Sequence, residues 1–245
     1  MSRQDILTVR ARSGLSGDMM LAGLAGLAEL TADKLVTFIG ELKLPALKDC
    51  LTLETCLVNH IAGLRCRIDL PREHHHRNLE DIQEIIDDSV MPENAKALAT
   101  RAFVLLADAE AAVHGKKSNE IEFHEVGALD SILDICLVCR IFTVLAPARF
   151  ICSPLPLADG VIRCAHGYVP SPAPAVLRML ENVPVHGFAD MGETVTPTAL
   201  SLLKALSAEF GDWPAMTVSK TLISYGDKIF PNTANGAIWA LGRRK

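Results

Sequence analysis

Apolar and polar positions along the chain follow two periods, which together predict many helices and several short strands. Residues 6–10 alternate in part, as expected of a strand, and lead through a turn of small residues into an Ala- and Leu-rich helix from about Asp18. Two strand-like runs on either side of residues 59–63 indicate a β-hairpin. Residues 79–89 carry apolar side chains at the helical spacing, with acidic side chains on the opposite face.

Start and stop signals for helices mark the middle of the chain. Pro92 and Gly115 bracket a long Ala-rich helix, because proline favours a first helical turn and glycine a C-terminal cap. Asp33 is expected to cap a shorter helix that precedes the hairpin. A third long helix is predicted to begin near Val126.

The pattern changes near Ala148. Beyond this residue we expect short strand-like pieces rich in proline, a helix that opens at residues 172–174, a last helix capped by Thr196, and a final strand. The chain is therefore predicted to have an α+β or α/β fold, with a helix-rich body and short mixed β-sheet elements. Residues 1–148 would form one lobe and residues 149–245 a proline-rich second lobe, unless both belong to one domain.

Composition and charge narrow the class of protein. Hydrophobic residues make up 49% of the 245 positions, enough for a sizeable core, and the apolar run 19–28 is too short to cross a membrane. A net charge of -5 argues against a nucleic-acid partner. The first residues do not resemble a secretion signal, and the seven cysteines show no framework-like spacing. We therefore expect a cytoplasmic protein with reduced thiols.

The first turn is a candidate anion site. Small residues fill it where the first strand leads into the first helix: Ser13, Gly14, Ser16 and Gly17. Free backbone N–H groups and the positive helix end would suit a phosphate there, and Arg12 would add a guanidinium. The alternative is an ordinary tight turn in which Ser16 or Asp18 caps the helix.

Three consecutive histidines, His74, His75 and His76, lie in the loop between the predicted hairpin and the next helix. Imidazole is a preferred ligand of nickel, zinc and copper, and a loop lets ligands rearrange as an ion arrives or leaves. Neighbouring loop residues cannot all face one ion, and solvated imidazoles that titrate near neutrality are the ordinary alternative. The triplet alone leaves both interpretations open.

A second segment gathers groups that bind metals or transfer protons: His114, His124, Glu125, Asp130 and Asp134. In the simpler interpretation these side chains complement the ends of two helices, and Asp134 lies on the surface. However, Asp134 stands inside the apolar run 129–137, and a carboxylate buried there would need a partner or an ion.

The remaining candidates have simpler explanations. Cys136 and Cys139 form a CxxC within an apolar helix and are expected to be small buried side chains rather than a zinc or redox site. His166 stands in a proline-stiffened loop, and Glu193 and Thr196 lie at a helix start. Each of these alone is typical of turn and cap chemistry.

Five motifs, taken together and in order, resemble the LarC family of nickel insertion proteins: SGLSGDM, HHHRNLEDI, FHEVGALDSILDI, GVIRCAHGYVPSPAPAVLRML and ETVTPTAL. The resemblance extends from about residue 6 to residue 235. It implies a nickel chelatase, a lyase that inserts nickel into pyridinium-3,5-bisthiocarboxylic acid mononucleotide during nickel-pincer cofactor biosynthesis. It also implies that nickel–sulfur and nickel–carbon bonds form, and that CTP is consumed with Mg²⁺ or Mn²⁺.

The resemblance gives the candidate residues a common purpose. It implies that the first turn holds the substrate phosphate through Arg12, Ser13, Gly14, Ser16 and Gly17. Nickel would be handled mainly by imidazoles, and residues 1–148 would form the metal-handling lobe. The implied nickel-binding residues are His74, His75, His76, His114, His124 and Glu125 in this lobe and His166 beyond it. The catalytic or proton-accepting groups would be Asp18, Glu125 and Asp134, since forming a nickel–carbon bond releases a ring proton.

The chain also departs from the family pattern. Arg10, Ala11 and Arg12 stand where the family usually has Asp-Cys-Phe, and Ala199 stands where it usually has glycine. Family members usually carry a further C-terminal domain linked to CTP use. Three interpretations therefore stay open: the chain is the amino-terminal half and only the metal-handling module, it works with a separate C-terminal-domain protein as partner, or it has lost insertion activity. Self-association into a homo-oligomer stays open. Two alternatives also stay open: a non-catalytic nickel chaperone or storage protein, and a degenerate member that binds a nucleotide-like ligand.

Overall fold

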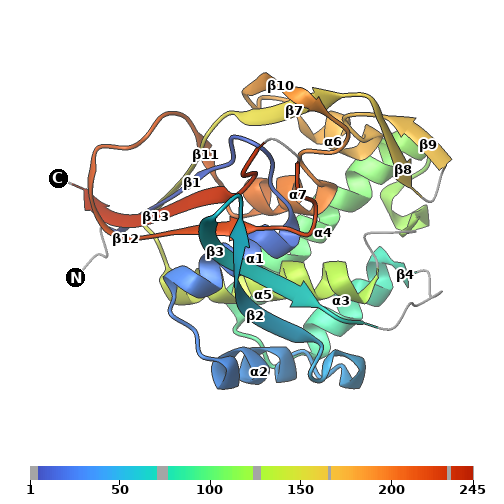
Figure 1. Ribbon diagram of the computed structural model, residues 1–245. Coiled ribbons are helices and arrows are strands. Elements are labelled where there is room, and N and C mark those ends of the chain that lie inside the picture. Colours follow the sequence, from blue (N-terminus) through green and yellow to red (C-terminus); the bar gives the residue numbers. More distant parts are fainter. Residues whose placement is uncertain (1–4, 71–76, 124–127, 165–166, 231–232, 245) are drawn as a thin grey trace.

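A seven-stranded mixed sheet organises the α+β fold (Figure 1). The computed structural model describes residues 5–70, 77–123, 128–164, 167–230 and 233–244. In spatial order the strands are β11 (Glu209–Phe210), β6 (Arg149–Cys152), β1 (Asp5–Arg10), β13 (Ala237–Arg244), β12 (Met216–Tyr225), β3 (Ile61–Ile68) and β2 (Leu51–Val58). The sheet therefore draws strands from both sides of Ala148, and the division into two lobes stays a prediction.

The pairing of the strands shows that the β2–β3 hairpin is joined to the rest of the sheet over a short length. β1 runs parallel to β6 and antiparallel to β13, while β12 runs antiparallel to β13. β12 and β3 pair in parallel only where Ser224 and Tyr225 lie beside Leu64 and Arg65. The β2–β3 hairpin consequently projects from the sheet (Figure 1). The other strands of the described residues form three two-stranded sheets: β10 (Val185–Met191) with β7 (Leu155–Asp159), β4 (Arg77–Asn78) with β5 (Glu122–Phe123), and β8 (Val161–Cys164) with β9 (Gly167–Pro170).

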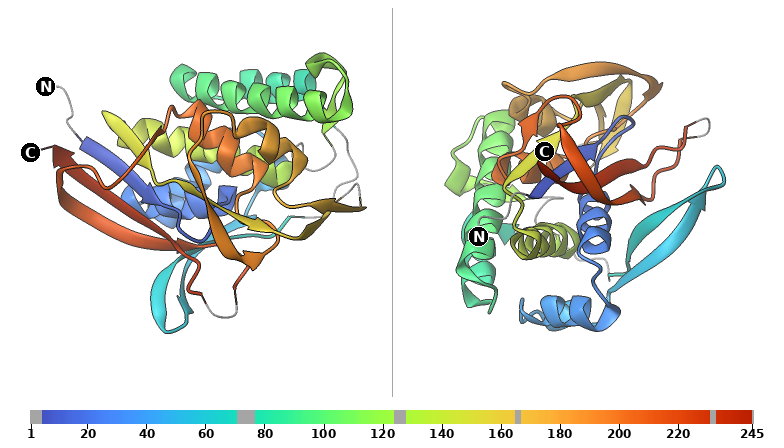
Figure 2. Two further views of the ribbon diagram at one scale, coloured as in Figure 1. Left: turned by 90° about the horizontal axis from the view of Figure 1, so that it is seen from above. Right: turned by 90° about the vertical axis from the view of Figure 1, so that its left-hand side faces the viewer.

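Helices pack in layers beside the sheet, and Figure 2 shows α1 and α5 between the sheet and α4. The inner helices are α1 (Gly17–Leu27), α5 (Leu129–Leu145) and α7 (Pro197–Ala205). The other helical elements are α2 (Ala32–Gly40), α3 (Leu79–Asp88), α4 (Glu93–His114), α6 (Pro174–Met179), η1 (Pro45–Leu47) and η2 (Ser118–Glu120). Within the described ranges, no helix combines the length and the apolar character needed to span a bilayer.

The small residues of α1 let this helix lie close to the sheet. A side chain added at Gly23 would come within 2.2 Å of the Trp239 ring on β13. Trp239 is fully buried, and its indole N–H donates a hydrogen bond of 2.8 Å to the hydroxyl of Ser224 on β12. The Ala- and Gly-rich composition of α1 thus fixes the position of its N-terminus over the ends of β12 and β3.

Most of the predicted elements are confirmed. β1, a turn and α1 follow one another as expected, and the hairpin turns at Asn59 and His60, which both have positive φ. The Ala-rich helix occupies Glu93–His114, with Gly115 in the left-handed conformation that ends it. The third long helix is present as α5, which begins at Leu129.

The predicted cap of α2 is wrong. Thr31, rather than Asp33, has the extended backbone of an N-cap, and its hydroxyl accepts a hydrogen bond of 3.3 Å from the backbone N–H of Lys34. Asp33 lies in the first turn instead, where its charge complements the helix dipole. Both residues are good caps, so the local pattern could not choose between them.

Candidate functional site

A cavity of about 680 Å³ opens where α1 and α5 begin and where β3 and β12 end. Its described walls come from segments far apart in the sequence, including residues 13–19, 128–134, 193–198 and 226–230. This volume is in the range of pockets that hold small-molecule ligands, typically about 300–1,000 Å³. The cavity is therefore the candidate site for a substrate.

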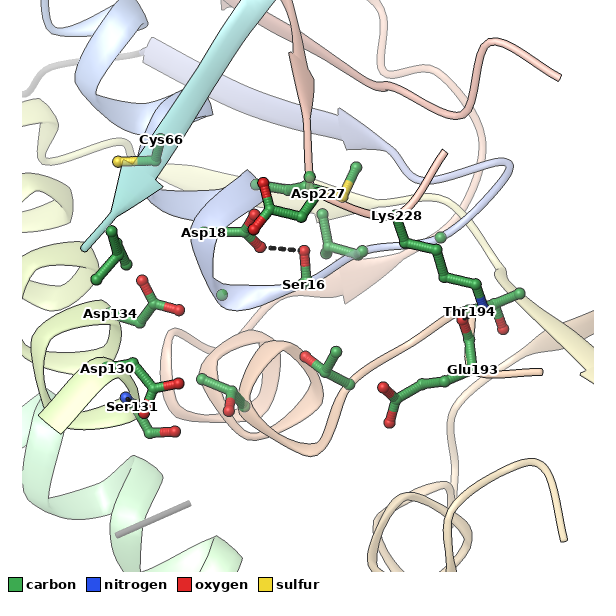
Figure 3. A pocket seen from close by; sticks show the side chains of 18 of the residues that line it. Ser16, Asp18, Cys66, Asp130, Ser131, Asp134, Glu193, Thr194, Asp227 and Lys228 are labelled. Atoms are coloured by element: carbon green, nitrogen blue, oxygen red, sulfur yellow. Dashed lines mark hydrogen bonds between the residues drawn. The ribbon is translucent and has the colours of Figure 1, made fainter. Parts of the chain in front are cut away.

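Acidic side chains are prominent on the described wall: Asp18, Asp130, Asp134, Glu193 and Asp227. Figure 3 shows Asp18, Asp130 and Asp134 on one side of the cavity. Asp134 is 9% exposed, and among the described residues its Oδ1 has no hydrogen-bond partner. A buried carboxyl group without a partner is costly, which points to a functional role.

Gly17 lets Asp134 approach the start of α1. A Cβ at Gly17 would lie 2.3 Å from Oδ2 of Asp134, so the Asp134 carboxyl group would have to move to admit any side chain there. Asp134 on α5 and Gly17 on α1 therefore belong to one close contact between two helix starts.

Both acids at this contact hold protons more tightly than usual. Burial raises the pKa of Asp134 well above its ordinary value, and the charges of Asp18 and Asp130 raise it further. Burial also raises the pKa of Asp18, against the hydrogen bonds from Ser16 and the Met19 backbone, and the charge of Asp227 adds to the rise. Two neighbouring carboxyl groups with raised pKa values suit proton transfer.

A thiol also lines the acidic side of the cavity. Cys66 on β3 is buried, and burial raises the pKa of its thiol, with smaller contributions from Asp134 and Asp18. Cys136 and Cys139 of the CxxC are instead fully buried free thiols within α5, as predicted. Cys66 thus presents a neutral S–H group to the site.

The glycine turn is joined to the segment that precedes α7. The backbone N–H of Leu15 donates to the carbonyl of Thr194 at 2.9 Å, and the N–H of Thr196 donates to the carbonyl of Leu15 at 3.1 Å. Gly14 has φ +137°, and a Cβ there would lie 2.5 Å from the Thr194 carbonyl oxygen. The turn conformation therefore requires glycine at this position.

The start of α1 already carries a carboxylate. The hydroxyl of Ser16 donates to Asp18, and the backbone N–H groups of Met19 and Asp18 also donate to the Asp18 carboxyl. Ser16 is the N-cap residue, but its side chain makes no cap hydrogen bond. The positive end of this helix is thus satisfied from within the chain.

The nickel insertion protein family matches residues 7–241, a range that contains every described wall of the cavity. The chain belongs to this family. A relative from Geobacter metallireducens, provisionally named a nickel insertion protein, is 38% identical over 223 residues, which cover 91% of this chain and 57% of the relative. A relative from Staphylococcus epidermidis, named pyridinium-3,5-bisthiocarboxylic acid mononucleotide nickel insertion protein, is 36% identical over 231 residues, which cover 92% of this chain and 57% of the relative.

The chain therefore spans little more than half the length of these curated relatives. No solved structure matches it.

Within this nickel insertion family member, the cavity brings together six of the residues predicted from the sequence: Ser13, Gly14, Ser16, Gly17, Asp18 and Asp134. Arg12 is exposed and is absent from the described lining. His114 ends α4, where its Nε2 lies 3.4 Å from Oε2 of Glu110, and it does not line the cavity either.

The other predicted ligands lie outside the described residues: His74, His75, His76, His124, Glu125 and His166. Within the described ranges, no three histidine, cysteine, aspartate or glutamate side chains are grouped to hold a metal ion. The assignment of nickel ligands therefore stays a prediction.

Sequence reasoning missed the wall formed by the β12–β13 connection. Asp227, Lys228 and Asn235 line the cavity, and Gly226 lies so close to Asp18 that an added Cβ would be 3.3 Å from its Oδ2. Gly-Asp-Lys follows β12 directly, but the bulge in β12 hides this strand in the sequence pattern, so these residues gave no signal of a site. No local sequence pattern connects residues 226–228 with Asp18.

Proposed function

We propose that this chain inserts nickel into pyridinium-3,5-bisthiocarboxylic acid mononucleotide, and that the substrate occupies the cavity. Membership of the nickel insertion family and the name of the S. epidermidis relative support this reaction. The observation that carries the proposal is the buried carboxyl group of Asp134, which lines a cavity of about 680 Å³ beside Asp18. Such a group can receive a proton from a ligand that fills the space.

Proton transfer is needed because nickel bonds to a ring carbon. Ni²⁺ takes the electron pair of the carbon–hydrogen bond, and the hydrogen leaves as a proton. Asp18 or Asp134 would accept this proton, since a carboxylate whose pKa is raised is a stronger base than an ordinary one. Glu125 stays a further predicted acceptor from the sequence.

Nickel handling is assigned from the sequence. His124 and Glu125 stand within four positions of Ala128, which lines the cavity, and this proximity along the chain supports them as groups that pass nickel to the substrate. The histidines at 74–76 and His166 are proposed to capture the ion. Because His114 lies outside the cavity wall, its proposed role is also in capture.

The family resemblance further implies CTP with Mg²⁺ or Mn²⁺. The described cavity wall holds a single basic side chain, Lys228, which suits one phosphate group better than a triphosphate. We therefore propose that CTP binds outside this cavity.

The test is to mix the purified chain with the dithioacid mononucleotide and Ni²⁺ and to follow the absorbance of the nickel–carbon product and its mass. Reactions with and without CTP and Mg²⁺ or Mn²⁺, and with and without the C-terminal-domain protein, identify what must be supplied. Product that depends on this chain in any of these mixtures supports insertion. Tight nickel binding without product in any mixture would show a nickel-holding protein instead.

A further inference from the structure

The cavity is electrically asymmetric. Lys228 is the one basic residue in its described lining, whereas five acidic residues share that lining. Figure 3 shows Lys228 with Glu193 on the side opposite Asp130 and Asp134. A ligand with an anionic end would therefore meet attraction on one side and repulsion on the other.

The ammonium group of Lys228 is held in place without being neutralised. Its Nζ donates a hydrogen bond of 2.8 Å to the carbonyl oxygen of Glu193 and lies 4.8 Å from the centre of the Phe230 ring. Among the described residues, no carboxylate forms an ion pair with it. One of its three N–H donors is used by a peptide carbonyl, so two are left for a ligand.

Hydrogen bonds hold the described part of the β12–β13 connection, which carries Lys228, in one conformation. The buried side chain of Asn235 donates to the carbonyl of Lys228 at 2.6 Å and accepts a hydrogen bond of 3.5 Å from the N–H of Phe230. Gly192 leaves room for the ammonium group, since a Cβ there would lie 3.2 Å from Nζ. The positive charge is thus positioned before any ligand arrives.

The start of α1 is a poorer place for an anion than Lys228. The Asp18 carboxyl already accepts the hydrogen bonds of Ser16 and Met19 there, so a phosphate would compete with a carboxylate for the same donors. The glycine turn still adjoins the wall that holds Lys228, because Leu15 is hydrogen-bonded to Thr194 and Thr196.

We propose that Lys228 binds the phosphate of a pyridinium mononucleotide at this wall, which directs the pyridinium ring toward Asp18 and Asp134. This inference rests on the proposed function and adds the orientation of the substrate in the cavity. It places the phosphate charge on Lys228 rather than on Arg12, and it leaves the acidic side for the ring that loses a proton.

The probes are nicotinic acid mononucleotide and nicotinic acid riboside, which differ only by the phosphate. In calorimetric titrations, wild type should bind the mononucleotide more tightly than the riboside. Lys228→Met should weaken mononucleotide binding by about tenfold or more while leaving riboside binding unchanged, and Lys228→Arg should restore most of the loss. Lys204→Met is the matched control, because Lys204 also donates to a backbone carbonyl, that of Glu181 at 3.2 Å, but lies outside the cavity.

Equal mononucleotide affinities for Lys228→Met and Lys204→Met, each with the wild-type Tm, would overturn the inference. So would a wild-type protein that does not distinguish mononucleotide from riboside. Neither result would decide whether the chain inserts nickel, because the insertion reaction is measured separately with the dithioacid substrate.

Discussion

Asp134 connects the stability of the protein to its proposed chemistry. Burial, followed by the charges of Asp18 and Asp130, raises its pKa in the folded state above the ordinary value of 3.8. The folded protein therefore binds this proton more tightly than the unfolded chain does. The stability that this group contributes is fully present below its unfolded pKa and is lost as the pH rises toward its folded pKa.

We expect Asp134→Asn to raise the free energy of unfolding at about pH 7, by roughly 1–3 kcal/mol, because the amide never ionises in the buried site. The gain should shrink toward about pH 3, below the ordinary pKa of 3.8, where the wild-type carboxyl is mostly protonated in both states. Thermal unfolding at both pH values checks this. The same variant should lose about a hundredfold or more in insertion rate if Asp134 accepts the ring proton.

Glu209→Gln is the matched control for this pH dependence. In the wild-type protein, hydrogen bonds from Arg149 lower the pKa of Glu209. The Glu209 carboxylate therefore contributes stability above its unfolded pKa, and this stability is lost as the pH falls through the folded pKa. Because the pair is largely exposed, the effect should stay below about 1 kcal/mol and have the opposite sign. An Asp134→Asn protein less stable than wild type at about pH 7 would contradict the assigned shift.

At the scale of elements, the cavity depends on how closely α1 and α5 meet. We expect Gly17→Ala to reduce stability by roughly 1–3 kcal/mol, because overpacking forces a buried neighbour to move. The added Cβ would lie 2.3 Å from Oδ2 of Asp134 and 3.0 Å from Cγ2 of Thr198. Urea unfolding measures the loss, and the insertion rate should fall with it as Asp134 is displaced.

Gly40→Ala provides the comparison within another helix. Nothing lies within 4 Å of a Cβ at Gly40 in α2, so this change should be neutral or stabilise by up to about 1 kcal/mol. If both glycine variants had the same stability as wild type, the close contact between Gly17 and Asp134 would be refuted.

Elements were predictable where local signals decide them. Pro92 and Gly115 act on their own helix ends, and the limits of α4 agree with the prediction. β12 was not predicted, because a bulge between Val218 and Lys220 interrupts the alternation of side chains along the strand. A period-two pattern with such a break does not stand out in the sequence.

At the scale of the whole molecule, the sequence could supply candidates but not their arrangement. Asp134 was identifiable, because an acid within an apolar run needs a reason to be there. Lys228 was not, because it reaches the cavity only after β12 pairs with β13 and β13 pairs with β1. The site thus depends on long-range pairing that no local pattern encodes.

Nickel affinity tests whether His124 and Glu125, which precede α5 in the sequence, belong to this site. Replacing His124 and Glu125 together with Ala should weaken nickel binding by about tenfold to a hundredfold, since each loss removes a donor. Calorimetric titration with Ni²⁺ measures it, and His60→Asn, at the exposed hairpin turn, is the control. A double variant that binds nickel like the control would remove both residues from the site.

The histidine triplet is expected to affect the rate of metal capture rather than the final complex. Imidazoles that collect an ion and pass it on accelerate its arrival, but they add nothing once the ion has moved to other ligands. Changing His74, His75 and His76 together to Asn should therefore slow nickel uptake in stopped-flow mixing, while the equilibrium stoichiometry stays at the wild-type value. Below about pH 6 the wild-type advantage should fade, because protonated imidazoles do not bind metal. Equal uptake rates for the triple variant and wild type at neutral pH would show that the triplet takes no part in capture, whereas a lower stoichiometry would make it part of the final nickel site.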